Sequence, residues 1–199
     1  MAPAADGEQS VPPVPGRRLR RAERRKQILD AATRAFARTG YGATGLDDIA
    51  AEAGISRVIL YRHFESKADL YRAALDRACT RLVDAVGDDN FTDDSIPALV
   101  EAAAEDPDGF RLLFRYAARE PEFRDMTDAL TTASRDVTYR QLAKLISDPH
   151  WTDWAARLIP TVTTEAVIAW LDAGQPAPDQ AAARIAQAVH GVIQAAQAP

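Results

Sequence analysis

Apolar residues along most of this chain recur at the three- and four-residue spacing of an amphipathic helix. The first such run contains Ile28, Leu29, Ala32, Ala35 and Phe36, and Gly40 ends it. The pattern predicts about nine helices, near residues 22–40, 44–53, 56–64, 67–86, 95–105, 107–119, 121–146, 151–173 and 179–196. No stretch alternates with the two-residue period of a strand, so we expect an all-α fold.

Capping and turn residues mark the ends of the short helices in the first third of the chain. Thr44 is the expected N-cap of the second helix, and Gly54 ends that helix in a turn where glycine adopts a positive φ at little steric cost. Ser66 is the expected N-cap of the fourth helix. Residues 44–67, TGLDDIAAEAGISRVILYRHFESK, therefore have the order of a helix-turn-helix, whose second helix can enter a DNA major groove.

The second helix of this unit divides into inward and outward residues. Ile49, Ile55, Leu60 and Phe64 are apolar and are expected to lock the two short helices onto the first helix. The outward set consists of Arg57, Val58, Ile59, Tyr61, Arg62 and His63. An ordinary helical hairpin with solvated charges would show the same division, so this pattern alone leaves both interpretations open.

The outward set has the chemistry that DNA recognition requires. Arg57 and Arg62 are both suited to bidentate contact with guanine. The Tyr61 hydroxyl can donate to a phosphate oxygen. Lys67, at the start of the next helix, adds a positive charge beside the N-terminal amides of that helix, which themselves attract phosphate.

Charge is unevenly distributed along the 199 residues, whose net charge is −5. Residues 1–80 contain 14 basic and 10 acidic residues, whereas residues 81–199 contain 10 basic and 19 acidic residues. Residues 17–26 alone hold seven bases and one acid. This run is either a solvated charge run or an arm that lies along phosphates or enters a minor groove. We expect residues 1–21 to form a disordered basic arm, and the overall charge excludes a uniformly basic DNA-coating protein.

Further positions around the helix-turn-helix carry a resemblance to a known family. They are the motif G-I-S-x-x-x-L-Y-x-x-F-x-S-K-x-x-L from Gly54 to Leu70, the preceding I-A-x-x-A, and Phe36 with Gly40 in the first helix. Together they make residues 22–75 resemble the TetR family of bacterial transcriptional repressors. The resemblance implies a DNA-binding domain over residues 22–66 and a helical ligand-binding and dimerisation domain over residues 67–199.

The resemblance also implies roles for individual residues. It implies base-edge contacts for Arg57, Val58 and Ile59, and mainly backbone contacts for Thr44, Tyr61, His63 and Lys67. Val58 and Ile59 are bulkier than the residues that many family members carry there, which favours apolar contact with thymine methyl groups. Gly45 stands where a hydroxyl residue is frequent, so one phosphate contact is expected to be missing. Asp47 also faces this side, where it either accepts a hydrogen bond from a cytosine amine or repels phosphate.

For the second half of the chain, the resemblance implies a cavity that binds a small-molecule effector. The expected lining residues are Phe110, Phe114, Arg115, Met126, Leu130 and Tyr139. An aromatic stripe at helical spacing also fits an ordinary core. Arg111, Arg115 and Arg119 either form a solvated stripe paired with nearby acids, or one of them enters the cavity and binds an anionic ligand.

The last two long helices are the expected surface of a homodimer. The proposed seam contains Trp154, Leu158, Val162, Ala166 and Ala169 from one helix, and Ile185, Ala188, Val189, Val192 and Ile193 from the other. Two such helices from each subunit would form a four-helix interface with two-fold symmetry. The alternative is that these faces close the core of a single subunit.

Other classes of function lack the residues that they need. The single cysteine, Cys79, allows neither an intrachain disulfide nor a cysteine-based zinc site, and the three histidines show no metal-ligand spacing. No nucleophile motif or glycine-rich phosphate loop is present, so we expect no enzyme, no cofactor and no metal site. No apolar run reaches the ~18–20 residues of a membrane span. Residues 1–16 also lack the apolar region of a signal peptide, and we therefore expect a cytoplasmic protein.

The sequence thus favours a transcriptional repressor that a small-molecule effector releases from a palindromic operator in double-stranded DNA. The alternative is a helix-turn-helix regulator without an effector, controlled by a protein partner or by its own concentration. A cavity of a few hundred Å3 in the second half of the chain would favour the first hypothesis, whereas a fully packed core would favour the second.

Overall fold

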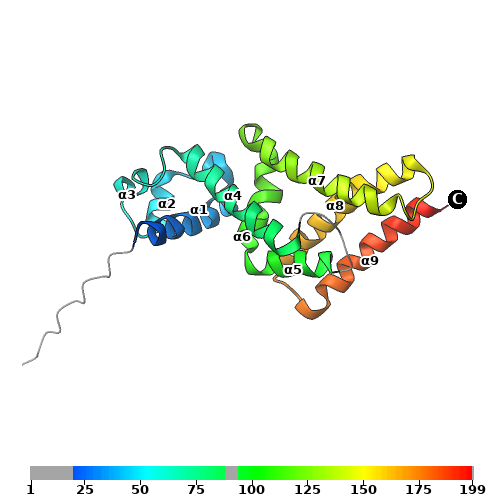
Figure 1. Cartoon of the computed structure of the whole chain (residues 1–199). Helices are drawn as coiled ribbons and strands as arrows, with labels where there is room; N and C mark the ends of the chain where they lie inside the picture. Colours follow the sequence, from blue (N-terminus) through cyan, green and yellow to red (C-terminus); the bar gives the residue numbers. More distant parts are fainter. Residues whose placement is uncertain (1–19, 88–93, 199) are drawn as a thin grey trace, which may run out of the picture.

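The computed structural model describes residues 20–87 and 94–198, and every regular element within these ranges is helical (Figure 1). Its α-helices are α1 (Arg21–Ala43), α2 (Leu46–Glu52), α3 (Arg57–Tyr61), α4 (Lys67–Val86), α5 (Ser95–Glu105), α6 (Pro107–Arg111), α7 (Arg124–Leu142), α8 (Pro149–Asp172) and α9 (Pro178–Gln197). Three short helices lie between α6 and α7, namely the π-helix η1 (Leu112–Tyr116) and the 3-10 helices η2 (Ala117–Arg119) and η3 (Pro121–Phe123). The expected all-α fold is confirmed.

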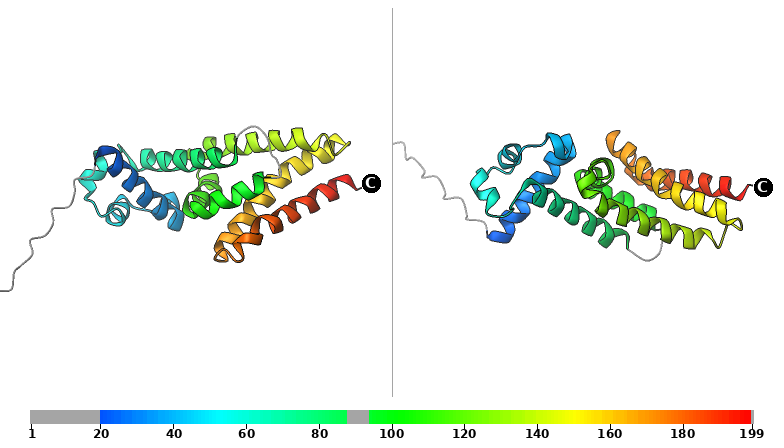
Figure 2. Two further views of the ribbon diagram at one scale, coloured as in Figure 1. Left: turned by 60° about the horizontal axis from the view of Figure 1, so that its bottom comes forward. Right: turned by 90° about the horizontal axis from the view of Figure 1, so that it is seen from above.

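The helices α1, α2 and α3 form a small unit at one end of the elongated molecule (Figures 1 and 2). α1 buries Phe36 completely, and α2 and α3 pack against it through the buried side chains of Ile49, Leu60 and Phe64. The turn between α2 and α3 contains Gly54, whose φ of +63° lies in the left-handed region that glycine enters without steric cost. This packing leaves the opposite side of α3 available to a partner.

The junction between α1 and α2 differs from the sequence prediction. The N-cap of α2 is Gly45 rather than Thr44, and the Asp48 carboxylate accepts a hydrogen bond from the Gly45 amide at 2.9 Å. Thr44 instead ends α1, where its hydroxyl lies 2.7 Å from the Gly40 carbonyl oxygen. Gly40, with a φ of +78°, breaks the helical path and brings these groups together. The sequence pattern identified a capping residue but assigned it to the wrong helix.

α4 connects the small unit to the rest of the chain. Ser66 caps its N-terminus as expected, because the Ser66 hydroxyl accepts from the Asp69 amide at 3.0 Å. The buried ring of Tyr71 lies edge-on to Phe36 of α1, with ring centroids 4.8 Å apart, and 4.6 Å from the ring of Phe123 in η3. These aromatic contacts pack α1, α4 and η3 against one another.

The long helices α7, α8 and α9 form the other end of the molecule (Figures 1 and 2). A second core cluster lies among them, built from Leu142, Ile146, Ala155, Ala156, Ile159, Val189 and Ala196. Within the described ranges, no helix combines the length and apolar character that crossing a bilayer requires.

The segment between α6 and α7 is less regular than the sequence predicted. One helix was expected over residues 107–119, but the structure changes there from α-helix to π-helix to 3-10 helix. The helix expected over residues 121–146 begins with the 3-10 turn η3, and its α-helical part ends at Leu142. Side-chain periodicity does not distinguish these helix types over a single turn, so the prediction was right about helical character and wrong about continuity.

Candidate nucleic-acid interface

α3 has a buried side and an exposed side, as the outward set of residues requires. Leu60 is completely buried, whereas Val58 is 64% exposed and Tyr61 is 47% exposed. Arg57 and Arg62 are also exposed. Because α3 is anchored by apolar contacts on one side only, its polar side can meet another molecule without disturbing the fold. Ile59 and His63, at the edges of this side, are half-buried.

Arg57 is the first residue of α3 and contacts both α2 and its own helix. Its Nη1 atom lies 3.0 Å from the Oδ2 atom of Asp47, and its Nη2 atom donates to the Tyr61 hydroxyl at 3.3 Å. The guanidinium carbon lies 5.6 Å from the centroid of the Tyr61 ring. The hydrogen bond to Tyr61, followed by the charge of Asp47, raises the pKa of Arg57, so this side chain stays charged.

Lys67 is held at the N-terminus of α4. Its Nζ atom donates to the Gly42 carbonyl oxygen at 3.4 Å and lies 4.5 Å from the centroid of the Tyr41 ring. The backbone N–H groups in the first turn of α4 are directed out of its N-terminus and give that end of the helix a partial positive charge. A lysine and a helix N-terminus at one place form a site that suits a phosphate group.

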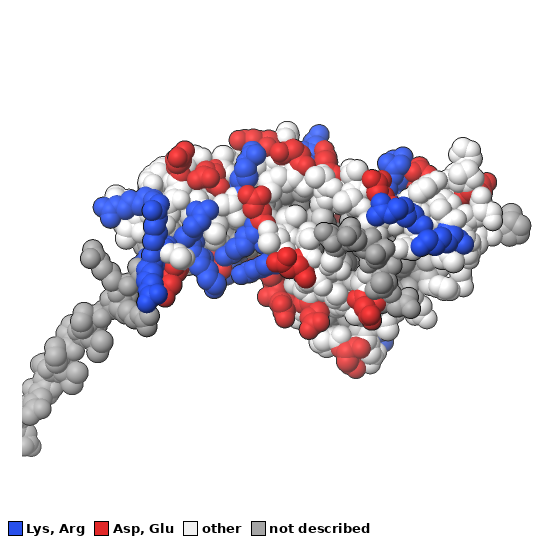
Figure 3. Space-filling view, viewed as in Figure 1, with Lys and Arg blue, Asp and Glu red and all other residues white. Residues whose placement is uncertain are grey.

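The N-terminal end of α1 adds basic residues beside α3. The guanidinium of Arg25 lies 4.3 Å from the centroid of the Phe64 ring, and its Nη1 atom donates to the His63 carbonyl oxygen at 3.4 Å. Burial, followed by the charges of Arg21, Arg25 and Arg24, lowers the pKa of His63. Figure 3 shows Lys and Arg side chains gathered at this end of the molecule. The sequence identified the basic run but did not show that Arg25 packs against the turn that follows α3.

The structure removes the Thr44 side chain from the expected backbone contacts. Thr44 is only 3% exposed, and its hydroxyl already interacts with the Gly40 carbonyl oxygen and with the Thr39 hydroxyl. A phosphate cannot reach this hydroxyl without opening the end of α1. The remaining members of the expected set (Arg57, Val58, Ile59, Tyr61, Arg62, His63 and Lys67) lie on α3, on the turn after it, or at the start of α4. Residues 1–19, which include most of the expected arm, lie outside the described residues.

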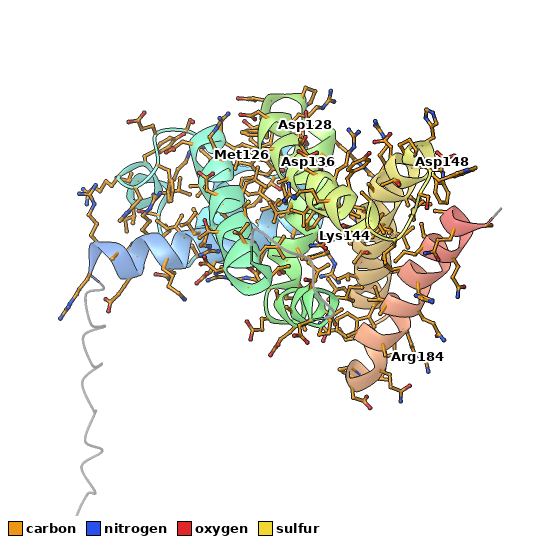
Figure 4. All side chains as sticks on the ribbon, turned by 45° about the vertical axis from the view of Figure 1, so that its right-hand side comes forward. Met126, Asp128, Asp136, Lys144, Asp148 and Arg184 are labelled. Carbon is orange, nitrogen blue, oxygen red and sulfur yellow. The ribbon has the colours of Figure 1, made fainter. Side chains whose placement is uncertain are left out.

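A cavity of about 1100 Å3 lies in the other part of the molecule, between α4, α5, η1, α7, α8 and α9. Its apolar lining includes Leu82, Val86, Ile96, Leu99, Leu113, Phe114, Leu130, Ile159 and Ile193. Thr131 and Thr138 of α7 also line it, but their hydroxyls donate to carbonyl oxygens one turn earlier in the same helix. Arg184 and His190 of α9 add polar groups, and Figure 4 labels Arg184 near the start of that helix.

The cavity contains two of the six expected ligand-binding residues, Phe114 and Leu130. The other four do not belong to its lining. Phe110 is buried against Phe114 with ring centroids 4.7 Å apart, and Tyr139 is 36% exposed. Met126 packs against the core cluster that contains Phe36, Tyr71 and Phe123. Arg115 forms an ion pair of 2.5 Å with Asp172, which Arg111 shares at 3.1 Å. The polar residues of α9 were missed, because α9 was expected to serve the dimer only.

Comparison with known proteins agrees with this arrangement of a small helical unit beside a larger helical domain. Residues 28–74 match the family model for bacterial regulatory proteins of the tetR family. The chain is 32% identical over 171 residues to the HTH-type transcriptional activator FasR of Mycolicibacterium smegmatis, and the match covers 81% of this chain and 78% of FasR. It is 50% identical over 54 residues to the HTH-type transcriptional regulator TtgR of Pseudomonas putida, covering 27% of this chain and 26% of TtgR.

Solved structures show the same fold over most of the chain. A TetR-like transcriptional regulator from Rhodococcus sp. RHA1 superimposes with a TM-score of 0.71 at 23% identity, covering 89% of this chain and 97% of that one. A tetR-family regulator from Streptomyces coelicolor gives a TM-score of 0.65 at 25% identity, covering 90% and 83%. The FasR match covers 171 residues and therefore extends well beyond the helix-turn-helix. This chain therefore belongs to the tetR family of bacterial regulatory proteins, and it is a transcriptional regulator rather than an enzyme.

Proposed function

We propose that this regulator binds a palindromic operator as a homodimer and releases it when a small-molecule effector occupies the cavity. One observation carries the proposal: an exposed, arginine-bearing α3 and a cavity of about 1100 Å3 lie in different parts of one chain. A cavity of about 1100 Å3 lies slightly above the range of about 300–1000 Å3 that is usual for small-molecule sites, so it is large enough for an effector and disfavours a regulator without one. The proposed domains are a basic arm at residues 1–21, a DNA-binding domain at residues 22–66 and an effector and dimerisation domain at residues 67–199. Operator binding implies a cytoplasmic location.

The proposed DNA contacts follow from the exposed side of α3. Arg57, Val58 and Ile59 contact base edges, with the two apolar residues against thymine methyl groups. The backbone contacts come from Tyr61, Arg62, His63 and Lys67. The Thr44 hydroxyl takes no part, because it is buried and hydrogen-bonded.

The proposed homodimer uses the outer faces of α8 and α9. Trp154 is 38% exposed, and Ala169 and Ala188 are also exposed. Val189 is buried in the subunit's own second cluster, so it belongs to the core rather than to the centre of the seam. Small exposed residues permit the close helix approach of a four-helix interface. Two-fold symmetry then presents two α3 helices to half-sites about 34–36 Å apart, or a multiple of that distance.

The proposed coupling runs through η1. Phe114 and Leu113 of η1 line the cavity, while Tyr116 at the end of the same element donates its hydroxyl to the Arg38 carbonyl oxygen of α1 at 3.3 Å. The Tyr116 ring also packs on Gly40, where an added Cβ would approach the ring to 3.2 Å. An effector shifts DNA binding only through its different affinity for two conformations. A ligand that displaces Phe114 would change the contact between Tyr116 and α1.

The direction of regulation separates two candidates. Repression is our first proposal, and activation is the second because FasR, which matches most of the chain, is named an activator. Both directions use the same DNA contacts. A reporter gene placed behind the selected operator decides between them by the sign of its response when the regulator is expressed.

The DNA-binding part is tested by selecting bound duplexes from a random pool and measuring affinity for the selected site. We expect Arg57→Ala to weaken that affinity at least about tenfold, because a bidentate base contact is lost in both subunits. Arg140→Ala, which removes an exposed arginine from α7, is the matched control and should retain the affinity of the unmodified protein. Equal affinities for the two variants would refute the assignment of α3 as the recognition helix.

The effector part is tested with a variant that fills the cavity. Small molecules are screened for those that raise the melting temperature and weaken binding to the selected operator. Leu130→Trp places a large ring in the cavity, so we expect it to abolish both effects of such a molecule. Ala133→Trp, at an exposed position of α7 outside the lining, should preserve them. A molecule that acts equally on both variants binds elsewhere.

A further inference from the structure

An acidic residue, Asp47, lies within the proposed DNA-binding surface and pairs with Arg57, the first residue of α3. The Asp47 side chain, on α2, is 75% exposed, and its two carboxylate oxygens lie 3.0 and 3.3 Å from Nη1 of Arg57 on α3. Tyr61 contacts the same guanidinium through its hydroxyl, which accepts from Nη2 at 3.3 Å, and through its ring. Two helices therefore hold one arginine between a carboxylate and a phenol.

These contacts restrict the guanidinium before DNA arrives. A free arginine side chain loses rotamer freedom when it binds, and a side chain already held in position loses less. A guanidinium carries five N–H groups in a planar fork, so the contacts with Asp47 and Tyr61 leave others to reach the O6 and N7 atoms of a guanine. Guanine can thus be bound while Asp47 keeps its place.

Contact with a phosphate is different. A phosphate that binds Arg57 brings the negative charge of the DNA backbone beside the Asp47 carboxylate, whose side chain is 75% exposed. The carboxylate and the phosphates carry like charges and repel each other. This repulsion opposes the sequence-independent part of DNA binding, which depends on phosphate contacts. Asp47 therefore favours one binding mode of Arg57 over the other.

We propose that Asp47 is a positioning residue that sets the base specificity of this regulator, by holding Arg57 toward guanine and by opposing its contact with phosphate. The inference rests on the proposed role of α3 as recognition helix. Exposed ion pairs contribute little to stability, so the fold does not depend on this contact. The role of Asp47 lies in discrimination between DNA sequences.

The test compares Asp47→Asn with Glu65→Gln. Both changes remove one negative charge from an exposed position of the DNA-binding unit, but Glu65 follows α3 and lies outside the contact with Arg57. Sequences are first selected from a random duplex pool with the unmodified protein and with Arg57→Ala, which identifies the guanine that depends on Arg57. Each variant is then measured against the selected duplex, a duplex with that guanine replaced, and a scrambled duplex.

We expect Asp47→Asn to bind the scrambled duplex more tightly and to discriminate roughly tenfold less against replacement of the guanine, in line with the loss of one well-oriented contact. Glu65→Gln should change its affinity for all three duplexes by a similar factor. Circular dichroism and melting temperature confirm that both variants are folded.

Three results would overturn the inference. If Asp47→Asn shifts all three affinities together, as Glu65→Gln does, then Asp47 acts only as a charge. If it loses preference at a neighbouring cytosine but keeps the guanine, then Asp47 contacts a base directly. If Arg57→Ala still selects the same guanine as the unmodified protein, then Arg57 does not read it. A protein that selects no sequence at all would refute the proposed function itself.

Discussion

At the scale of the residue, Glu52 links the first two helices through a pair of arginines. Its carboxylate accepts from Nε of Arg34 at 2.8 Å and also from Arg38. The hydrogen bond from Arg38, followed by that from Arg34, lowers the pKa of Glu52 to about 2. Because the pKa is lower in the folded state, the ionised carboxylate stabilises the fold above the unfolded pKa of 4.5, and this contribution is lost as the pH falls toward 2.

We therefore expect Glu52→Gln to lower the free energy of unfolding at neutral pH and to flatten its pH dependence between about pH 4.5 and 2. Urea unfolding at a series of pH values measures both effects. Glu101→Gln, which removes an exposed acid from α5, should leave the pH dependence of the unmodified protein in place. An identical acid profile for Glu52→Gln and the unmodified protein would contradict the role of this ion pair.

Helix periodicity predicted which site residues face outward, but it did not predict their contacts with other helices. The spacing of Leu60 and Phe64 determined which side of α3 is buried, and hence that Arg57 and Tyr61 face outward. The contact between Arg57 and Asp47 joins residues ten positions apart on different helices, and no local pattern predicts it. Thr44 was assigned to the wrong helix end because the bend at Gly40, which brings the Thr44 hydroxyl to the Gly40 carbonyl oxygen, is not visible in the helical periodicity.

At the scale of the element, the contact of η1 with α1 gives a test of how the unit of α1, α2 and α3 is held to the rest of the chain. The Tyr116 hydroxyl donates to the Arg38 carbonyl oxygen at 3.3 Å, at the bend of α1. We expect Tyr116→Phe to lower the free energy of unfolding by about 0.5–1 kcal/mol, as for loss of one hydrogen bond near the surface. Amide exchange in residues 38–44 should become faster, measured by hydrogen–deuterium exchange.

Tyr139→Phe is the control, since it removes a phenol hydroxyl from an exposed residue of α7. Unchanged exchange in residues 38–44 of Tyr116→Phe would show that this hydrogen bond does not hold the bend.

The helices themselves were largely predictable, because the long runs have a clear 3.6-residue period. The changes of helix type after α6 were not, because they depend on which carbonyl oxygen each amide bonds to.

At the scale of the whole molecule, the proposed homodimer uses the outer faces of α8 and α9. Ala188 is exposed in the proposed seam, so Ala188→Asp adds a charge there without entering the subunit core. Burying two unpaired carboxylates near a two-fold axis opposes association. We expect sedimentation to show dissociation into folded monomers, together with weaker operator binding, because the two α3 helices are no longer coupled.

Ala133→Asp makes the same substitution on an exposed face of α7 and should sediment like the unmodified protein. If Ala188→Asp also remains a dimer, another surface joins the subunits.

Sequence periodicity alone could not separate Val189, which faces the core, from its neighbour Ala188, which faces outward. The direction in which α9 packs decides this, and that packing is a property of the whole domain.

The π-helical geometry of η1 affects how the side chains on either side of it are oriented around the helix axis. A π turn closes its hydrogen bonds over one residue more than an α turn does, and one residue of an α-helix corresponds to about 100° around its axis. If η1 relaxed to α-helical geometry, the side chains beyond it would swing around the axis by about that angle relative to those before it. Leu113, which lines the cavity, and Tyr116, which contacts α1, both belong to η1. We therefore expect such a change at the cavity wall to alter the angle at which Tyr116 meets α1.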